Sequence, residues 1–367
     1  MPDAEPVSRC FAPTYREARA GFLEAVRRRG LAPESHVHPA ARGAEGEALA
    51  IDVALAGAAD APAILVVTSG THGAEGFCGS GVQRALLADD DLLRRAGSGG
   101  VALLLVHAVN PYGFSHLRRV NEEGVDLNRN FVDFAAPRAP NEAYAAVHDL
   151  LVPAAWPPTQ ANRDAVAART AAMGAARFQA VVTGGQGVRP DGLFYSGERP
   201  AWSNATLRDI LRRHGSGRAR VAWIDIHTGL GPQGHGERIF AGVNDAAELA
   251  RARAWYGADV MSYYDGGSAS AEVRGPVPMC VYDECPRAET TSIALEFGTH
   301  PMATVLDAIR GDHWLAVHPD APPAVRDAVK RAMRDAFYVD SDGWRGMVLG
   351  QARTTVLQAV IALSARG

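Results

Sequence analysis

The sequence predicts an α/β fold in which helices flank a mostly parallel, mixed central sheet. Short apolar runs that end in glycine or proline alternate with segments of helical periodicity. The order strand, helix, strand within residues 61–111 is that of a βαβ unit, and such units build parallel sheets. The 367 residues, 47% of them hydrophobic, contain no repeat or obvious linker, so we expect a single domain over 1–367.

The first half of the chain is predicted to supply a helix, a strand and the βαβ unit. Residues 14–30 have amphipathic spacing followed by glycine, which is typical of a helix. Residues 48–57 alternate between apolar and polar positions, as a strand does. The βαβ unit has apolar strands at 61–70 and 100–111, with a helix at 79–97 between them.

The second half is predicted to be richer in helices. A Gly- and Pro-rich stretch at 184–202 is expected to form a loop over the cleft and to shape the substrate pocket. Two further apolar strands are predicted at 219–231 and 290–300. Helices are predicted at 141–153, 160–182, 205–215, 322–337 and 346–365.

Charge and cysteine content narrow the class of protein. The net charge of −4 gives no general drive toward nucleic acid or an anionic membrane, so neither is an expected partner. The four cysteines form no CxxC pair and have no zinc-finger spacing. The first residues are acidic and lack an apolar segment of the signal-peptide kind, so cytoplasmic residence is the expectation.

Polar residues stand at the ends of all four apolar runs. In an open, mostly parallel sheet, ligands bind beyond the carboxyl ends of the strands, so these side chains should share one crevice. Two histidines and one glutamate are a ligand set of catalytic zinc. An HxxE spacing alone is also compatible with an ordinary polar loop. The residues concerned are His72, Glu75, Asn110, Asp225, His227 and Glu296.

A second stretch, GVDLNRNF at 124–131, is more specific. The pieces HGAE at 72–75, GVDLNRNF, DIH at 225–227 and LEFGT at 295–299 occur in the order found in the M14 zinc carboxypeptidases. The chain therefore resembles that superfamily, and more narrowly its DUF2817 branch. Succinylglutamate desuccinylase and aspartoacylase are similar in having HxxE, an Asn-Arg pair, a DxH segment and a late glutamate.

The resemblance implies a zinc-carboxypeptidase-like fold and a role for each matching residue. One Zn²⁺ per chain would lower the pKa of a water molecule to about 7 and polarise a carbonyl. A nearby carboxylate serves as general base, and arginine grips a carboxylate bidentately. The implied metal ligands are His72, Glu75 and His227; the base is Glu296; Asn128 and Arg129 bind the substrate carboxylate; Arg119, or else Arg118, polarises the carbonyl.

The sequence leaves open the role of Asp225 and the identity of a possible catalytic tyrosine. Asp225 points to the same face of its strand as His227, so it either orients that histidine or is an ordinary capped acid. The carboxypeptidases also use a tyrosine near the leaving group. No tyrosine here matches by spacing, and the candidates are Tyr263, Tyr264 and Tyr282.

The leading functional prediction is a zinc-dependent hydrolase that cleaves an amide or peptide bond next to a free carboxylate. The alternative keeps the metal and changes the substrate to an N-acyl amino acid. A third reading is a catalytically silent binding protein, which the complete set of ligands and base argues against. In either enzymatic reading the partner is a small molecule or peptide with a free carboxylate, and the oligomeric state is open.

Overall fold

The computed structural model describes residues 7–136 and 141–364. Its centre is a seven-stranded sheet in the order β1-β2-β4-β3-β5-β7-β6. The four inner strands β4, β3, β5 and β7 are parallel, and the outer pairings are antiparallel. The predicted α/β fold with a mixed central sheet is thus confirmed. The strands are β1 Glu34–Arg42, β2 Ala48–Ala56, β3 Ala63–Ser69, β4 Val101–His107, β5 Arg220–Gln233, β6 Gly236–Phe240 and β7 Glu289–Gly298.

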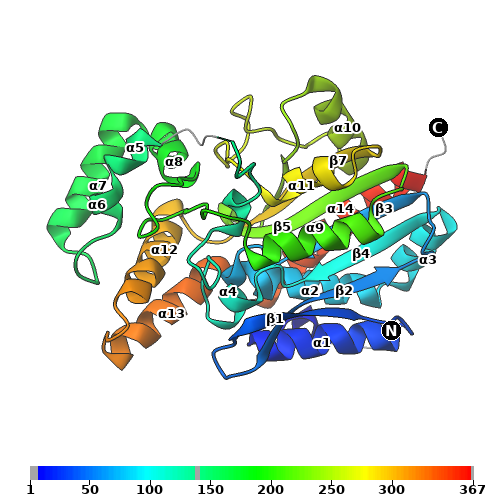
Figure 1. Cartoon of the computed structure of the whole chain (residues 1–367), viewed down its shortest axis with the longest axis horizontal. Coiled ribbons are helices and arrows are strands. Elements are labelled where there is room, and N and C mark those ends of the chain that lie inside the picture. The colour runs from blue at the N-terminus through cyan, green and yellow to red at the C-terminus, as the bar shows by residue number, and fades with distance from the viewer. Residues whose placement is uncertain (1–6, 137–140, 365–367) are drawn as a thin grey trace.

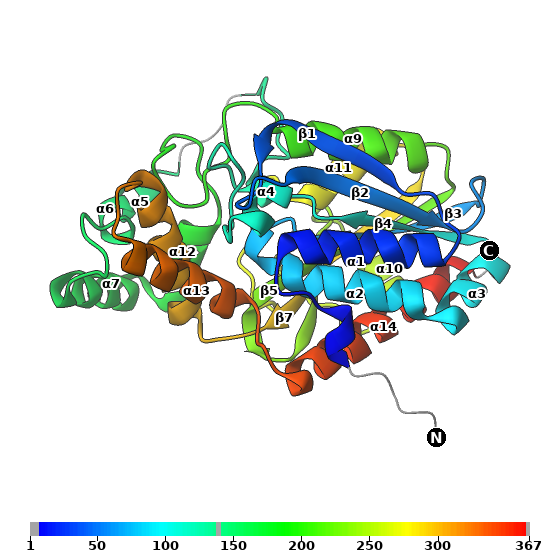
Figure 2. The same cartoon turned by 90° about the horizontal axis from the view of Figure 1, so that it is seen from below.

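Helices cover both faces of the sheet. Alternate residues of the buried strands point to opposite faces, so the sheet has two apolar cores. Helices α9 (Trp202–His214) and α11 (Cys280–Glu284) pack on one face (Figure 1). The other face is covered by α1 Tyr15–Arg28, α2 Gly76–Ala88, α3 Asp90–Ser98, α10 Ala246–Tyr256 and α14 Asp342–Ser364 (Figure 2).

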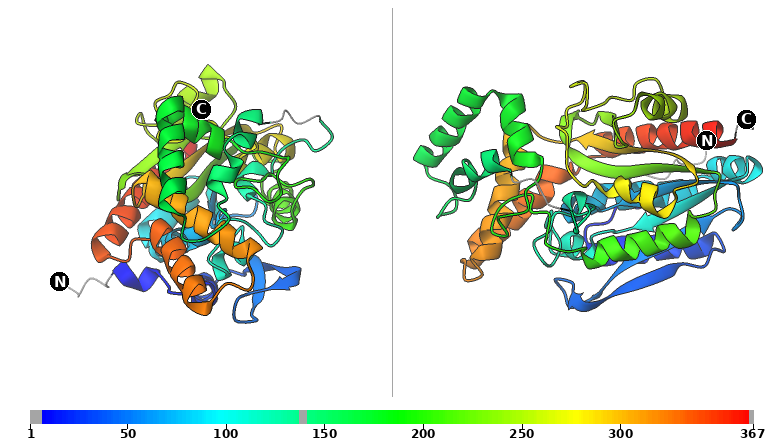
Figure 3. Two further views of the ribbon diagram at one scale, coloured as in Figure 1. Left: turned by 90° about the vertical axis from the view of Figure 1, so that its left-hand side faces the viewer. Right: turned by 45° about the horizontal axis from the view of Figure 1, so that its top comes forward.

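A separate group of helices lies beyond the carboxyl ends of the parallel strands (Figure 1, left; Figure 3). These helices share an apolar core of their own, to which Tyr144, Phe178, Val305 and Phe337 contribute. They close one side of the region where the strands end. The group comprises α5 Glu142–Ala145, α6 His148–Leu151, α7 Gln160–Met173, α8 Ala175–Thr183, α12 Met302–Val317 and α13 Pro323–Phe337, and the short α4 Pro111–Ser115 lies next to it.

Several details differ from the sequence-based expectation. The helices predicted at 79–97 and 160–182 are each divided in two, as α2 and α3 and as α7 and α8, and α10 and α12 were not predicted. The helix predicted at 141–153 is two short helices, α5 and α6, since the chain turns near Val147 to bury Tyr144 and Leu151 in the same core. Strand β1 was not predicted: as an edge strand it is largely exposed and has little apolar pattern. Helix α14 starts at Asp342, earlier than expected, and position 365 of its predicted range lies outside the described residues.

Helix α14 is long and apolar enough, by length and composition alone, to cross a membrane. In this fold it packs along the sheet through Trp344, Val348 and Val356, which are fully buried. A core helix passes the same length and composition test, so this helix carries no membrane assignment.

Candidate metal centre

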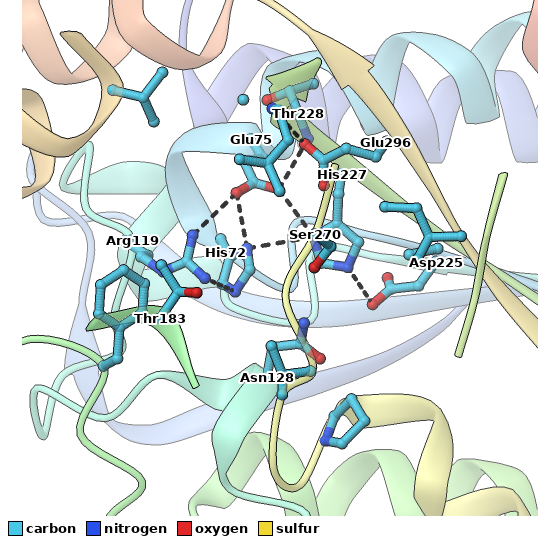
Figure 4. Close-up of a pocket in the computed structure, with 18 of the residues that line it drawn as sticks. His72, Glu75, Arg119, Asn128, Thr183, Asp225, His227, Thr228, Ser270 and Glu296 are labelled. Carbon is cyan, nitrogen blue, oxygen red and sulfur yellow. Dashed lines mark hydrogen bonds and ion pairs between the residues drawn. The ribbon is translucent and has the colours of Figure 1, made fainter. Parts of the chain in front are cut away.

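The carboxyl ends of neighbouring parallel strands bring the predicted metal ligands together (Figure 4). His72 follows β3, Glu75 ends the short helix η2 (Gly73–Glu75), and His227 lies in β5. Glu75 Oε1 is 2.7 Å from His72 Nδ1, and Glu75 Oε2 is 3.0 Å from His227 Nδ1. One possible ligand atom from each of the three side chains lies within 4.8 Å of the others. All three are buried.

In each of the two histidines, Nε2 lies next to a further buried carboxylate. His227 Nε2 is 2.7 Å from Asp225 Oδ2. Burial alone would lower the pKa of His227, but Asp225 and then Glu75 raise it well above the usual value, so both ring nitrogens carry a proton until a metal replaces the one on Nδ1. His72 Nε2 is 3.2 Å from Asp126 Oδ1 and 2.7 Å from Arg119 Nη2. Because arginine only donates, the contact with Arg119 requires a lone pair on His72 Nε2. A metal on Nδ1 would leave Nε2 protonated, so Asp126 would then replace Arg119 as the partner of Nε2.

The buried acids in this cluster are held in their ionised form by their neighbours. Burial alone would raise the pKa of Glu75, but His72 and His227 lower it below its usual range. Burial likewise opposes ionisation of Asp126, yet Arg119 and then Arg129 hold its pKa well below the usual value. The pKa of Asp225 is lowered in the same way, against burial, by His227 and by hydrogen bonds from two threonines.

Glu296 differs from the other acids of this cluster, because its pKa is raised. It lies in β7 directly opposite His227 of β5, and the backbone N–H of Leu230 donates to its Oε1 at 3.0 Å. Burial, followed by the charge of Glu75, raises the pKa of Glu296 to about 8. A carboxyl group with a pKa near neutrality can accept a proton and give it back, which is what acid–base catalysis requires.

The two adjacent arginines point to different places. Arg119 lines the pocket, donates through Nε to Asp126 Oδ2 at 2.9 Å, and has Nη1 3.5 Å from Glu75 Oε1. Arg118 forms an ion pair with Asp312 of α12 at 3.1 Å and does not line the pocket. Of the two candidates, Arg119 is therefore the one that faces the predicted metal ligands.

The predicted carboxylate-binding pair also lines this pocket. Both residues belong to the short helix η3 (Leu127–Arg129). Asn128 Oδ1 accepts from the backbone N–H of Val277, and its side chain faces the cluster (Figure 4). Arg129 donates to the carbonyl oxygens of Thr183 and Asn128 through three of its N–H groups, which leaves one hydrogen on each terminal nitrogen. Burial lowers the pKa of Arg129 to about 10, so it stays charged.

The Gly- and Pro-rich loop contributes one side chain to the pocket. Phe194 has a left-handed backbone, with φ 55°, and its ring is 5.0 Å from the guanidinium carbon of Arg119 and 5.6 Å from that of Arg129. Contacts of this kind favour the charged guanidinium and restrict its orientation. Tyr263 is the candidate tyrosine that lines the pocket, whereas Tyr264 and Tyr282 bond elsewhere.

Sequence reasoning missed Asp126 and Phe194 as parts of the site. Asp126 stands inside the GVDLNRN stretch, two residues before Asn128, and an acid at a fixed place in that motif was the available signal. Phe194 had no such signal, because its contacts are with residues more than 60 positions away. Asn110 was predicted at the crevice but caps α4 instead, and its side chain donates to the backbone oxygen of Arg119.

The donor set fits a divalent zinc ion. Two imidazole nitrogens and the Glu75 carboxylate form the possible ligand set. A further carboxylate lies next to Nε2 of each imidazole, Asp126 at His72 and Asp225 at His227, as is usual for metal-bound histidine.

Fold and site together define an α/β protein with a buried His-Glu-His cluster at the carboxyl edge of its parallel strands. Residues 11–351 match the family described as "Protein of unknown function (DUF2817)", and the chain belongs to this family. The predicted family assignment is thereby confirmed. No curated protein is detectably similar to the chain in sequence.

Several solved structures share features of the fold at low similarity. Thrombin activatable fibrinolysis inhibitor matches with TM-score 0.47 and 13% identity over 89% of this chain and 77% of its own. Carboxypeptidase A from Helicoverpa armigera matches with TM-score 0.45 and 13% identity, over 90% and 77%. A metallo-carboxypeptidase from Burkholderia cenocepacia matches with TM-score 0.44 and 16% identity, over 97% and 70%. Because these values are low, the function is inferred from the side chains of the pocket.

Proposed function

We propose that this protein is a zinc-dependent hydrolase that cleaves an amide or peptide bond next to a free carboxylate. The observation that carries the proposal is the convergence of His72, Glu75 and His227 on one buried point. Glu296 and two arginines line the same pocket. An acid, a metal-ligand set and a carboxylate-binding group are the parts that such a hydrolysis needs.

His72, Glu75 and His227 would hold the zinc ion, which supplies a Lewis acid for the scissile carbonyl and lowers the pKa of water. Glu296 takes the proton from the attacking water and delivers it to the leaving nitrogen. Arg119 donates to the carbonyl oxygen as negative charge develops on it; removal of one such donor commonly lowers the rate by about 10²–10³.

Substrate binding is assigned to Asn128 and Arg129. The two N–H groups that Arg129 has left can form a paired contact with a carboxylate, and the Asn128 amide adds a donor beside it. The guanidinium is fixed in advance by Thr183 and Phe194, so little rotational freedom is lost on binding.

One observation favours the second candidate, an N-acyl amino acid deacylase. Two walls of the pocket, α8 and the segment 263–278, are joined by hydrogen bonds: Gln179 Nε2 donates to Ala269 O at 2.8 Å and Arg274 N to Gly184 O at 3.2 Å. A pocket bounded in this way suits a short substrate better than a long peptide. The catalytic groups are the same in both candidates.

The test is a hydrolysis screen of the zinc-loaded enzyme with C-terminal dipeptides and N-acyl amino acids, read by mass spectrometry. We expect cleavage within one of these two classes. Glu296→Gln is the control: it should keep its zinc and lose about 10²–10⁴ in rate. No cleavage of either class by a protein with full zinc content would refute the proposal, and normal rates in the Glu296→Gln variant would refute the role of Glu296.

A further inference from the structure

The floor of the pocket is set by the register of three strands. His227 of β5 and Glu296 of β7 lie side by side, and the next row on the same face consists of Asp225, Ala294 and Ile239. Ala294 and Ile239 both line the pocket, as does Ala241, two residues further along. Beside the metal ligands, the sheet therefore offers small or branched apolar side chains.

The walls of the pocket continue this apolar surface. One wall comes from the segment 263–278 and the other from α12 and the end of α13. Beyond the floor, these walls present Val273, Pro276, Met302, Val305, Ile309 and Phe337.

The charged residues of the pocket all belong to the proposed catalytic and binding groups. They are His72, Glu75, Arg119, Arg129, Asp225, His227 and Glu296. Asp225 has both oxygens engaged, by Thr68, Thr71 and His227, so it is not available to a substrate cation.

The neutral polar side chains of the pocket mostly have their donors engaged within the protein. Gln179 donates to Ala269 O, Thr183 donates to Gln179 O, and Ser270 donates to Ala271 O. Burial raises the pKa of Tyr263, so its hydroxyl stays neutral. An anionic side chain of the substrate would thus find few free donors here, and a cationic one would find no carboxylate outside the proposed catalytic groups, so either would lose its hydration without compensation.

We infer that the substrate is an amino acid with an uncharged apolar or aromatic side chain, acylated at its nitrogen, and that this side chain lies on Ala294, Ile239 and Ala241. The inference rests on the proposed function, because it takes the carboxylate to be held by Arg129 and the acyl carbonyl to face the metal ligands. Basic and acidic side chains are disfavoured because the described residues offer no free counter-charge on this surface.

The first test separates binding from turnover. Zinc-loaded Glu296→Gln protein is titrated calorimetrically with N-acetyl-L-phenylalanine, N-acetyl-L-arginine and N-acetyl-L-glutamate, and the wild-type enzyme is assayed for hydrolysis of each. We expect the phenylalanine compound to bind at least about tenfold more tightly than the other two. Tighter binding of the arginine or glutamate compound, or no binding of any, overturns the inference.

The two proposals fail in different ways in this experiment. Selective binding of the phenylalanine compound without hydrolysis of it or of dipeptides supports the side-chain inference and refutes the proposed reaction. Hydrolysis that favours the arginine compound refutes the side-chain inference and supports the proposed reaction.

A charge placed in the floor provides the second test. Ile239→Asp, in the Glu296→Gln background, should weaken binding of N-acetyl-L-phenylalanine and strengthen that of N-acetyl-L-arginine, each by about tenfold or more. Ala241→Asp serves the same purpose if the first variant fails to fold. Val243→Asp is the control, because Val243 is 37% exposed and lies outside the pocket. An unchanged preference in a folded floor variant overturns the inference.

Discussion

At the scale of single residues, Asp126 and Asp225 do the same task for two different histidines. Each is fully buried, and each has a carboxylate oxygen close to Nε2 of its histidine, at 3.2 Å for Asp126 and 2.7 Å for Asp225. Such carboxylates orient a ligand histidine and raise its basicity. Asp126 also pairs with Arg119, so it links a proposed metal ligand, His72, to the group proposed to bind the carbonyl oxygen.

Asp126→Asn should therefore weaken zinc binding by about 10–100-fold, the usual cost of losing such a partner. The measurement is the zinc affinity by competition with a chelator. The exposed Asp149, changed to Asn, is the matched control and should leave the affinity unaltered. Equal affinities for the two variants would contradict the role given to Asp126.

At the scale of elements, η2 and α4 approach so closely that only glycine fits between them. A Cβ on Gly73 would lie 1.9 Å from the carbonyl carbon of Gly113 and 2.1 Å from the nitrogen of Phe114. The backbone N–H of Ala74 in η2 also donates to the carbonyl oxygen of Arg118 at 2.9 Å. This contact sets the position from which His72 and Glu75 reach the site.

Gly73→Ala should displace η2 and abolish stoichiometric zinc binding, measured by metal analysis of the purified protein. Gly97→Ala in α3 is the control, since no atom lies within 4 Å of its Cβ position. That change should be neutral or stabilise the fold by about 0.5–1 kcal/mol. Full zinc content in a folded Gly73→Ala protein would show that the close approach does not position the ligands.

The elements also show what the sequence could predict. Apolar runs such as 61–70 and 219–231 indicated buried parallel strands, and polar residues at their ends indicated a shared site. That inference needed only local pattern and the rule that parallel strands end together. The edge strand β1 and the break between α5 and α6 depend on tertiary contacts and had no local signal. The position of Phe194 and the apolar floor of the pocket could not be predicted from the sequence for the same reason.

At the scale of the whole molecule, a histidine far from the proposed metal centre makes stability depend on pH. His107, at the end of β4, is stacked on Phe22 and bonded through Nε2 to Ser80 at 3.0 Å. Within the described residues its Nδ1 is buried without a partner. Burial lowers the pKa of His107 to about 4, from a usual value of 6.5. The folded protein therefore holds this imidazole neutral.

Between pH 6.5 and about 4 the unfolded chain gains a proton at this position that the folded chain does not, so stability is lost as the pH falls. The loss due to His107 should reach about 3 kcal/mol, at about 1.4 kcal/mol per pKa unit. Urea unfolding of the wild type and of His107→Asn across this range measures it, because other titrating groups are common to both. Parallel pH curves for the two proteins would contradict the assignment.

The central claim for the molecule is that His72, Glu75 and His227 hold one zinc ion, and zinc-edge X-ray absorption of the zinc-reconstituted protein tests it most directly. Burial raises the pKa of the nearby Cys78 thiol, so sulfur should not be a ligand. We predict one zinc per chain with two imidazole nitrogens and carboxylate oxygen in its first shell, lost in His227→Ala. Zinc well below one per chain, or a sulfur ligand in the spectrum, would contradict the account.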